Sequence, residues 1–261
     1  MRLFGRGDTD EDREREPEEY VYAGDDVAFG ISHVGARENN EDGMLVLRLP
    51  DAYLLAVADG LGGHNAGEVA SQMAVDTLRE VFEKEYTAGM NESDVAGLLK
   101  RAHELAHGRI KGAAIGERAG MGTTLTSAFV RGGRALIANT GDSRAWLIRK
   151  GSIVVRTKDH SLVQELVDKG EITEEEAKRH PMRNIVTRAL GIELGVDLYD
   201  WELEPGDMLL LSTDGLHDYV DDETIADIVS RLKTPQEIAI ELVAAALPVT
   251  RDNVTVVVWK G

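Results

Sequence analysis

The 261-residue sequence contains no cysteine, and this absence removes several kinds of chemistry. Without cysteine there is no disulfide, no thiolate metal site and no thiol nucleophile. Cysteine-dependent phosphatase and protease mechanisms are therefore excluded. Any hydrolytic centre in this chain must be built from oxygen and nitrogen groups.

Long apolar runs and an excess of positive charge are also missing. No run approaches the ~18 apolar residues that a membrane helix needs, and the N-terminus lacks the apolar centre of a signal peptide. We therefore expect a cytoplasmic protein with no membrane partner. The formal net charge is −18, which disfavours binding to a nucleic-acid backbone, so we expect no nucleic-acid partner either.

The chain is long enough, and apolar enough, to bury a sizeable core. At 43% hydrophobic residues we expect one domain over residues 20–261. Residues 1–19 instead carry eight acidic and four basic side chains with few apolar ones, which predicts a disordered arm. Residues 158–190 are irregular and helical, and predict either a flap over a substrate groove or surface decoration. No coiled-coil pattern is present, so a monomer is expected.

Apolar patterns predict strands and helices along the rest of the chain. Strand-like stretches at 27–33, 44–49 and 53–58 predict an antiparallel meander, and helices at about 66–86 and 93–111 should pack as an antiparallel pair. Further strands are expected at 121–130, 134–139, 145–149, 198–203, 208–212 and 254–259, and further helices at 222–232 and 235–247. Capping boxes at Thr173 and Thr234 mark two helix starts.

Acidic side chains stand at the ends of four predicted strands. Asp42 and Asp252 directly precede strands, whereas Asp59 and Asp214 directly follow them. In antiparallel pairs the start of one strand lies beside the end of its neighbour, so the four carboxylates can share one rim of a sheet. Gathered carboxylates repel one another unless cations neutralise them. An all-oxygen ligand set points to Mg²⁺ or Mn²⁺.

Two such ions suit phosphoryl chemistry. About 3.5–4 Å apart, they lower the pKa of a bridging water and hold it for in-line attack on a phosphoryl group. Gly60, which follows Asp59, lets backbone approach closely and can offer a carbonyl ligand. The Arg37 guanidinium matches a phosphate, although a lone arginine is more often a surface residue. Asp142 follows Gly141, and this pair is common in hairpin turns.

Six motifs in one order make the chain resemble the metal-dependent protein phosphatase family, the 2C type of Ser/Thr phosphatase. The resemblance runs from about Val27 to Lys260. It rests on Arg37 with Asn40-Glu41-Asp42, Asp59-Gly60 with Gly62-Gly63 and Gly67-Glu68, Gly122-Thr123-Thr124, Gly141-Asp142-Ser143-Arg144, Asp214-Gly215, and Asp252-Asn253. Each motif is weak alone, but six in this order with compatible spacing are specific.

The resemblance implies an α+β fold, a four-layer α-β-β-α sandwich. Two antiparallel sheets would be flanked by antiparallel helix pairs, with a metal centre in the cleft at one end. By this likeness Asp59 bridges two ions, the Gly60 carbonyl binds one of them, and Asp214 and Asp252 complete the other.

Further residues complete the site that the resemblance implies. Asp42 and Glu41 would hold metal-bound water, and Asn253 would support the site beside Asp252. Asp142, together with Asp214 and Asp218, matches the place where some members take a third, weaker ion.

The implied activity is divalent-metal-dependent hydrolysis of phosphoserine and phosphothreonine in proteins, by attack of a metal-bridging water. Arg37 would grip the substrate phosphate, and no covalent phospho-enzyme would form. The implied partners are phosphoproteins, with a Ser/Thr protein kinase as a candidate partner. Either Mn²⁺ or Mg²⁺ would serve.

The chain departs from some family members directly after Asp59-Gly60. Those members carry a histidine there as a candidate general acid, whereas this chain has Leu61. His64 follows three residues later, as in bacterial-type members. Two roles stay open for it: a general acid that acts through a water, or a solvent-facing or capping residue of a glycine-rich turn, with metal-bound water as the acid.

Two other functions stay open. One is a catalytically silent member that binds phosphoproteins, which the joint presence of Asp59, Asp214, Asp252 and Arg37 disfavours. The other is a metal-dependent phosphodiesterase or nuclease, which the acidic composition and the lack of a basic groove disfavour.

Overall fold

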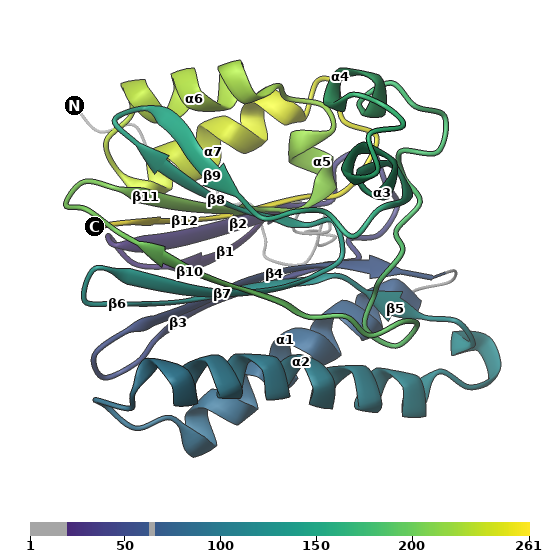
Figure 1. Cartoon of the computed structure of the whole chain (residues 1–261), viewed down its shortest axis with the longest axis horizontal. Coiled ribbons are helices and arrows are strands. Elements are labelled where there is room, and N and C mark those ends of the chain that lie inside the picture. The colour runs from purple at the N-terminus through teal and green to yellow at the C-terminus, as the bar shows by residue number, and fades with distance from the viewer. Residues whose placement is uncertain (1–19, 63–65) are drawn as a thin grey trace, which may run out of the picture.

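The computed structural model describes residues 20–62 and 66–261. Two antiparallel sheets stack face to face, and helices cover the outer face of each (Figure 1). This arrangement is the predicted four-layer α-β-β-α sandwich. The predictions of a disordered arm over residues 1–19 and of a role for His64 fall on residues outside the described ranges.

Each sheet holds six strands. In spatial order, the first sheet contains β1 (Tyr20–Gly24), β2 (Ala28–His33), β12 (Val254–Lys260), β11 (Met208–Ser212), β8 (Arg144–Arg149) and β9 (Ser152–Arg156). The second contains β10 (Asp197–Glu202), β7 (Arg134–Thr140), β6 (Leu125–Arg131), β4 (Tyr53–Leu61) and β3 (Asp42–Arg48), with β5 (Gly122–Thr123) paired to the end of β4.

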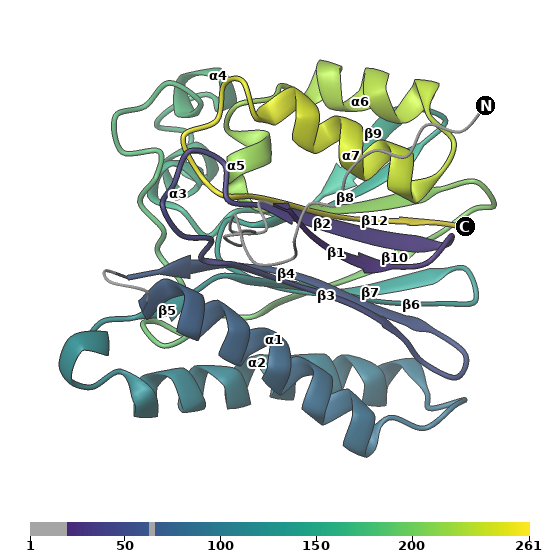
Figure 2. The same cartoon turned by 180° about the vertical axis from the view of Figure 1, so that it is seen from behind.

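One helix pair covers each sheet. The pair α1 (Ala66–Glu85) and α2 (Glu92–Ala113) lies on the second sheet, and the pair α6 (Asp222–Arg231) and α7 (Pro235–Ala246) lies on the first (Figures 1 and 2). The shorter helices α3 (Leu162–Asp168), α4 (Glu174–Ala177) and α5 (Asp214–His217) gather at one end of the sandwich, and a 3₁₀ turn, η1 (Gly116–Arg118), follows α2. The predicted antiparallel packing of α1 and α2 is therefore confirmed.

Three buried apolar layers bind the four structural layers together. Successive side chains of a strand point to opposite faces, so β4 contributes to two of these layers. Leu54 packs under α1 and α2. Leu55 points to the opposite face, where it joins Leu211 of β11 in the layer between the two sheets. Leu242 of α7 packs on the outer face of the first sheet. This double burial explains why β4 reads as a continuous apolar run rather than an alternating one.

One prediction of local topology is wrong. The first three predicted strands do not form a meander, because β2 pairs with β1 and β12 in the first sheet while β3 and β4 pair in the second. The Gly141-Asp142 pair, a combination common in hairpin turns, does not form a hairpin here. It links β7 of the second sheet to β8 of the first, so it carries the chain across the sandwich at the end where the acidic motifs gather.

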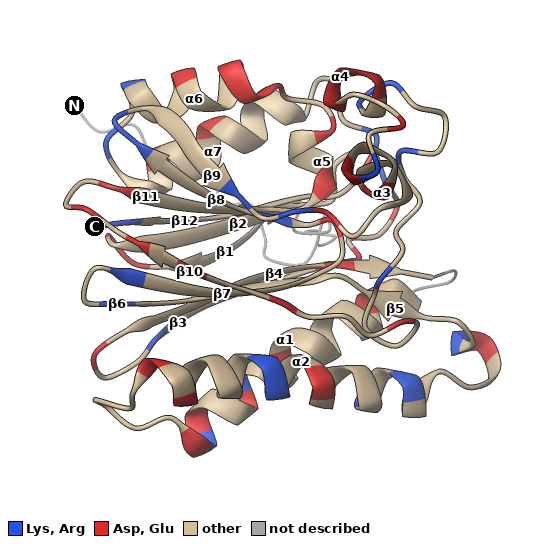
Figure 3. Cartoon of the chain, viewed as in Figure 1, with Lys and Arg blue, Asp and Glu red and all other residues tan. Residues whose placement is uncertain are grey.

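Within the described ranges no helix combines the length and the apolar character needed to cross a bilayer. Acidic and basic residues are interspersed along α1 and α2, as Figure 3 shows. Mixed charge of this kind lacks the basic stripe that phosphate backbones attract.

Candidate metal and phosphate site

Asp42 and Asp59 lie directly opposite each other in the second sheet. Asp42 is the first residue of β3, Asp59 lies near the end of β4, and the register of these strands pairs the two residues. The Thr213 hydroxyl, which belongs to the first sheet's side of the cleft, donates a hydrogen bond of 2.9 Å to Asp42 Oδ2. The two carboxylates therefore stand where the facing sheets meet.

Asp214 and Asp252 come from the first sheet. Asp214 begins α5 just after β11, and Asp252 lies just before β12, the neighbour of β11. The prediction that all four aspartates share the rim of one sheet is therefore wrong. They come in pairs from the facing ends of two sheets, because β3 and β4 belong to one sheet and β11 and β12 to the other.

Burial, together with nearby carboxylates, raises the pKa of four carboxyls at this meeting point, those of Asp42, Asp59, Asp142 and Asp214. For Asp59 the shift is large, with burial as the main cause and the charge of Asp214 next. Asp214 is shifted well upward by burial and then by the charge of Asp142. Burial, with smaller effects from neighbouring carboxylates, raises the pKa of Asp42 and of Asp142 to about 7. The raised pKa values mean that the surrounding protein disfavours the ionised carboxylates. A bound cation would offset their charges, so the cluster has the electrostatics of a cation site.

The cluster fits hard divalent ions in its chemistry. Its donors are carboxylate oxygens, which Mg²⁺ and Mn²⁺ prefer, and it has no soft ligand. Within residues 20–62 and 66–261, no group of three or more acidic or histidine side chains already encloses a finished ion site.

Asn253 joins the loop before β3 to the start of β12. Its Oδ1 accepts the Glu41 N–H at 2.8 Å, and its Nδ2 donates to the Val34 and Asn39 carbonyl oxygens at 2.7 and 2.9 Å. Both polar ends of this buried amide are therefore used. Asn253 fixes Glu41 beside the cluster, where burial raises the pKa of the Glu41 carboxyl.

Gly60 permits a close approach between β4 and the start of α1. A Cβ atom at Gly60 would lie 2.3 Å from the Gly67 carbonyl oxygen and 2.5 Å from that of Glu41. The Gly60 N–H donates to the same Glu41 oxygen at 3.1 Å. Any larger residue would push the helix away from Asp59. The ligand role of the Gly60 carbonyl stays a prediction.

Arg37 lies at the edge of the carboxylate cluster. Its Nη2 donates to Asp252 Oδ2 at 2.7 Å and its Nε to the Arg251 carbonyl oxygen at 3.2 Å. The Asp252 hydrogen bond is the main reason that its pKa is raised, and the charges of Asp59 and Asp214 contribute. Half of the side chain is exposed. A guanidinium held at this place is available to an incoming anion, and its phosphate role stays a prediction.

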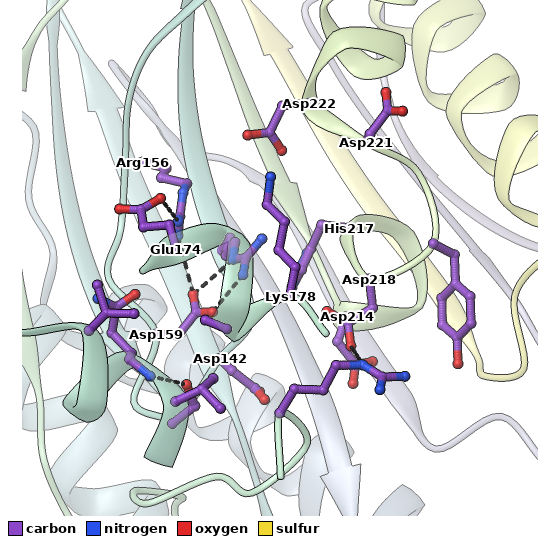
Figure 4. Close-up of a pocket in the computed structure, with 18 of the residues that line it drawn as sticks. Asp142, Arg156, Asp159, Glu174, Lys178, Asp214, His217, Asp218, Asp221 and Asp222 are labelled. Atoms are coloured by element: carbon purple, nitrogen blue, oxygen red, sulfur yellow. Dashed lines mark hydrogen bonds and ion pairs between the residues drawn. The ribbon is translucent and has the colours of Figure 1, made fainter. Parts of the chain in front are cut away.

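A cavity of about 250 Å³ opens beside the cluster. Asp159 and Glu174, which belong to the segment 158–190, lie across it from Asp214 and Asp218 (Figure 4). Burial raises the pKa of Asp218, whose carboxylate lies 3.9 Å from the Arg183 guanidinium of the same segment. The segment therefore forms one wall of the cavity, and its role as a flap over substrate stays a prediction.

Three hydroxyl side chains hold the site, and Thr213 alone among them stands outside the six motifs of the sequence. The Asp59 N–H donates to Thr124 Oγ1 at 2.8 Å, and Thr124 Oγ1 lies 2.7 Å from Ser143 Oγ. Thr213 holds Asp42 from the opposite sheet. Ser143 directly follows Asp142 and Thr213 directly precedes Asp214 in the sequence, whereas Thr124 has no acidic neighbour. A hydroxyl residue directly before Asp214 is thus the signal that could have identified Thr213.

Gly215→Ala should destabilise the protein, because no space exists for a side chain at this position. A Cβ atom there would lie 1.8 Å from the Asn253 carbonyl oxygen, so α5 and the start of β12 must separate. Overpacking of this kind costs about 1–3 kcal/mol in the free energy of unfolding, measured by urea denaturation. Gly97→Ala in α2 is the control, since nothing lies within 4 Å of its Cβ position. Equal stability of the two variants would contradict the close contact.

Comparisons with known proteins agree with this geometry. The family model described as Protein phosphatase 2C matches residues 29–244. The serine/threonine phosphatase stp of Listeria welshimeri is 38% identical over 226 residues, covering 84% of this chain and 89% of the relative.

Solved structures are similar over the same region. Serine/threonine phosphatase Stp1 from Staphylococcus aureus superposes with a TM-score of 0.85 at 35% identity, covering 92% of this chain and 97% of that one. The catalytic domain of the serine threonine protein phosphatase PstP, crystallised in complex with two manganese ions, has a TM-score of 0.73 at 37% identity and covers 92% and 97%. Sequence, fold and the acidic cleft thus agree, and the chain belongs to the protein phosphatase 2C family.

Proposed function

We propose that this chain is a divalent-metal-dependent Ser/Thr protein phosphatase. The observation that carries the proposal is the cluster of Asp42, Asp59, Asp142 and Asp214 at the meeting point of two sheets beside Arg37, where burial and then neighbouring carboxylates raise the pKa of each of the four. The manganese ions of PstP and the phosphatase activity named for the relatives support it.

Asp59, Asp214 and Asp252 would hold two Mn²⁺ or Mg²⁺ ions with the Gly60 carbonyl, and Asp142 with Asp218 would take part in a third site. When bound, such ions activate a water and offset the charge of the phosphoryl group. Asp42 and Glu41 orient water at the site through their carboxylates. His64, if it acts as the general acid, protonates the leaving serine or threonine oxygen.

The substrates that fit this site are phosphoserine and phosphothreonine side chains on proteins. The cavity walled by the segment 158–190 would receive residues next to the phosphorylated one, so this segment would influence which peptides are accepted. We further propose a cytoplasmic monomer that opposes a Ser/Thr protein kinase acting on the same proteins.

The decisive experiment is phosphate release from a phosphothreonine peptide by the purified chain, with Mn²⁺, with Mg²⁺ and with a chelator. Metal-dependent release that the chelator stops is the expected result. Tight peptide binding without release would favour the catalytically silent alternative. Faster hydrolysis of a phosphodiester than of the phosphopeptide would favour the phosphodiesterase alternative.

Arg37→Ala should raise the KM for the phosphopeptide more than it lowers kcat, because the guanidinium binds phosphate without taking part in proton transfer. Loss of a charge-assisted hydrogen bond predicts a fall in kcat/KM of roughly 10- to 100-fold. Arg37→Lys keeps the charge but loses the bidentate geometry. Its kcat/KM should therefore lie between that of the unchanged protein and that of Arg37→Ala. Steady-state kinetics at saturating Mn²⁺ measure both parameters. An unchanged KM in Arg37→Ala would remove Arg37 from the phosphate site.

A further inference from the structure

His160 stands at the base of the segment 158–190 and is bonded twice to Gly141. The His160 N–H donates to the Gly141 carbonyl oxygen at 2.9 Å, and the Gly141 N–H donates to His160 Nδ1 at 3.1 Å. Only 6% of His160 is exposed. Because Nδ1 accepts a hydrogen bond, the ring proton must sit on Nε2.

The other ring nitrogen faces the chain that follows the segment. His160 Nε2 lies 3.2 Å from Asp197 Oδ2 and 3.4 Å from Arg188 Nη1. The ring proton therefore has an acceptor in the Asp197 carboxylate. The imidazole thus bridges Gly141 on one side and the residues that lead into β10 on the other.

Gly141 stands at a position of the site that has no room for a side chain. Its φ of +105° is one that residues with a side chain rarely adopt, and a Cβ there would lie 2.5 Å from Thr124 Cγ2. Thr124 in turn holds the Asp59 N–H. The next residue, Asp142, exerts the largest charge effect on the pKa of Asp214. The position of the Gly141 backbone therefore determines the position of the Asp142 carboxylate in the cluster.

Other bonds run parallel to this one between the same two segments. Arg144 donates to both oxygens of Asp159 at 2.8 and 2.6 Å, and the Thr157 N–H donates to the Ala145 carbonyl oxygen at 3.0 Å. These bonds lie on the β8 side of Asp142. The His160 ring holds the opposite side, at Gly141, so Asp142 is fixed from both directions.

We propose that His160 is a positioning residue that fixes Asp142 at the metal centre through Gly141. Because His160 belongs to the segment 158–190, the affinity of the cluster for divalent ions then depends on the position of this segment. The inference rests on the proposed function in that it assumes divalent ions bind at the cluster.

Two substitutions separate the two sides of the ring. In His160→Asn the side-chain oxygen can take the place of Nδ1 and still accept the Gly141 N–H. In His160→Gln the terminal amide reaches the Nε2 position and Asp197, but Gly141 loses its acceptor. Asp197→Asn is the matched control, because it alters the same ring's other contact without touching Gly141.

Mn²⁺ binding to the full chain, measured by calorimetry, is the first readout. His160→Gln should weaken the weakest resolved Mn²⁺ site about tenfold or more, as loss of a ligand-orienting partner does. His160→Asn and Asp197→Asn should bind Mn²⁺ like the unchanged protein. At saturating peptide, kcat should fall in His160→Gln, with KM nearly unchanged.

The unsubstituted chain offers an independent measurement. During a Mg²⁺ titration followed by NMR, the ¹⁵N shift of His160 Nδ1 should move as the weakest ion binds. An unresponsive Nδ1 would overturn the proposal, and so would Mn²⁺ binding that is unchanged in folded His160→Gln or equally weakened in His160→Asn. Absence of phosphate release by the unsubstituted chain would contradict the proposed phosphatase function. The calorimetric measurement would still test the role of His160, because it measures ion binding and not hydrolysis.

Discussion

Asp214→Asn should abolish metal-dependent phosphate release while leaving the fold intact. Asparagine keeps the shape of the side chain but removes the charge that attracts a divalent ion. Because the ion would activate the attacking water, we expect kcat to fall roughly 10³-fold or more. The buried Asp214 carboxyl is repelled by Asp142, Asp218 and Asp252. Removing its charge should therefore raise the melting temperature of the metal-free protein.

The measurement pairs phosphate release with far-UV circular dichroism during heating. Asp227→Asn makes the same change of charge at an exposed position of α6, where the carboxylate pairs with Arg231, and it should leave turnover unchanged. Loss of the folded signal in Asp214→Asn, or turnover equal to that of Asp227→Asn, would contradict the assignment of Asp214.

The metal-free chain should lose stability as the pH rises from about 5.5 to about 7.5. The pKa of Asp42 and of Asp142 is raised to about 7 in the folded state, from an ordinary value of 3.8. In this interval the folded state binds more protons than the unfolded state, so the free energy of unfolding falls as the pH rises. The expected loss is on the order of 2 kcal/mol for each carboxyl.

Urea denaturation in the presence of a chelator, at several pH values, measures this slope. Mn²⁺ at about 100 times its dissociation constant should restore about 2.7 kcal/mol per site at pH 7.5, because it binds the ionised cluster of the folded state. At low pH the same ion should stabilise less, since protons occupy the carboxylates. A stability that rises between these pH values without metal would show that the carboxylates are not buried together.

The local elements were largely predictable because each is encoded by its own neighbours in the sequence. The box of Thr234 and Glu237 begins α7 as predicted, and β11 has the predicted bounds, Met208–Ser212. The edge strands β1 and β9 were missed. Their residues are mostly exposed, so neither shows the apolar alternation by which a strand is recognised.

The composition of the site was also readable, although its assembly was not. Asp42, Asp59, Asp214 and Asp252 were identified as a cluster, and the oxygen-only ligand set followed from the missing cysteines. Their assignment to one sheet failed because an apolar strand records that it is buried, and not which strand lies beside it. The partners of β2 and β4 depend on contacts between residues far apart in the chain.

The sequence by itself determined the kinds of group at the site, the order of the motifs and the family. These properties depend on residue types and on short-range spacing, which the chain carries in every conformation. Only the tertiary structure decided that two sheets meet at the cluster, that Asp252 pairs with Arg37, and that His160 holds Gly141. Such contacts form only when sheet packing brings distant segments within hydrogen-bond distance, and no local pattern records that distance.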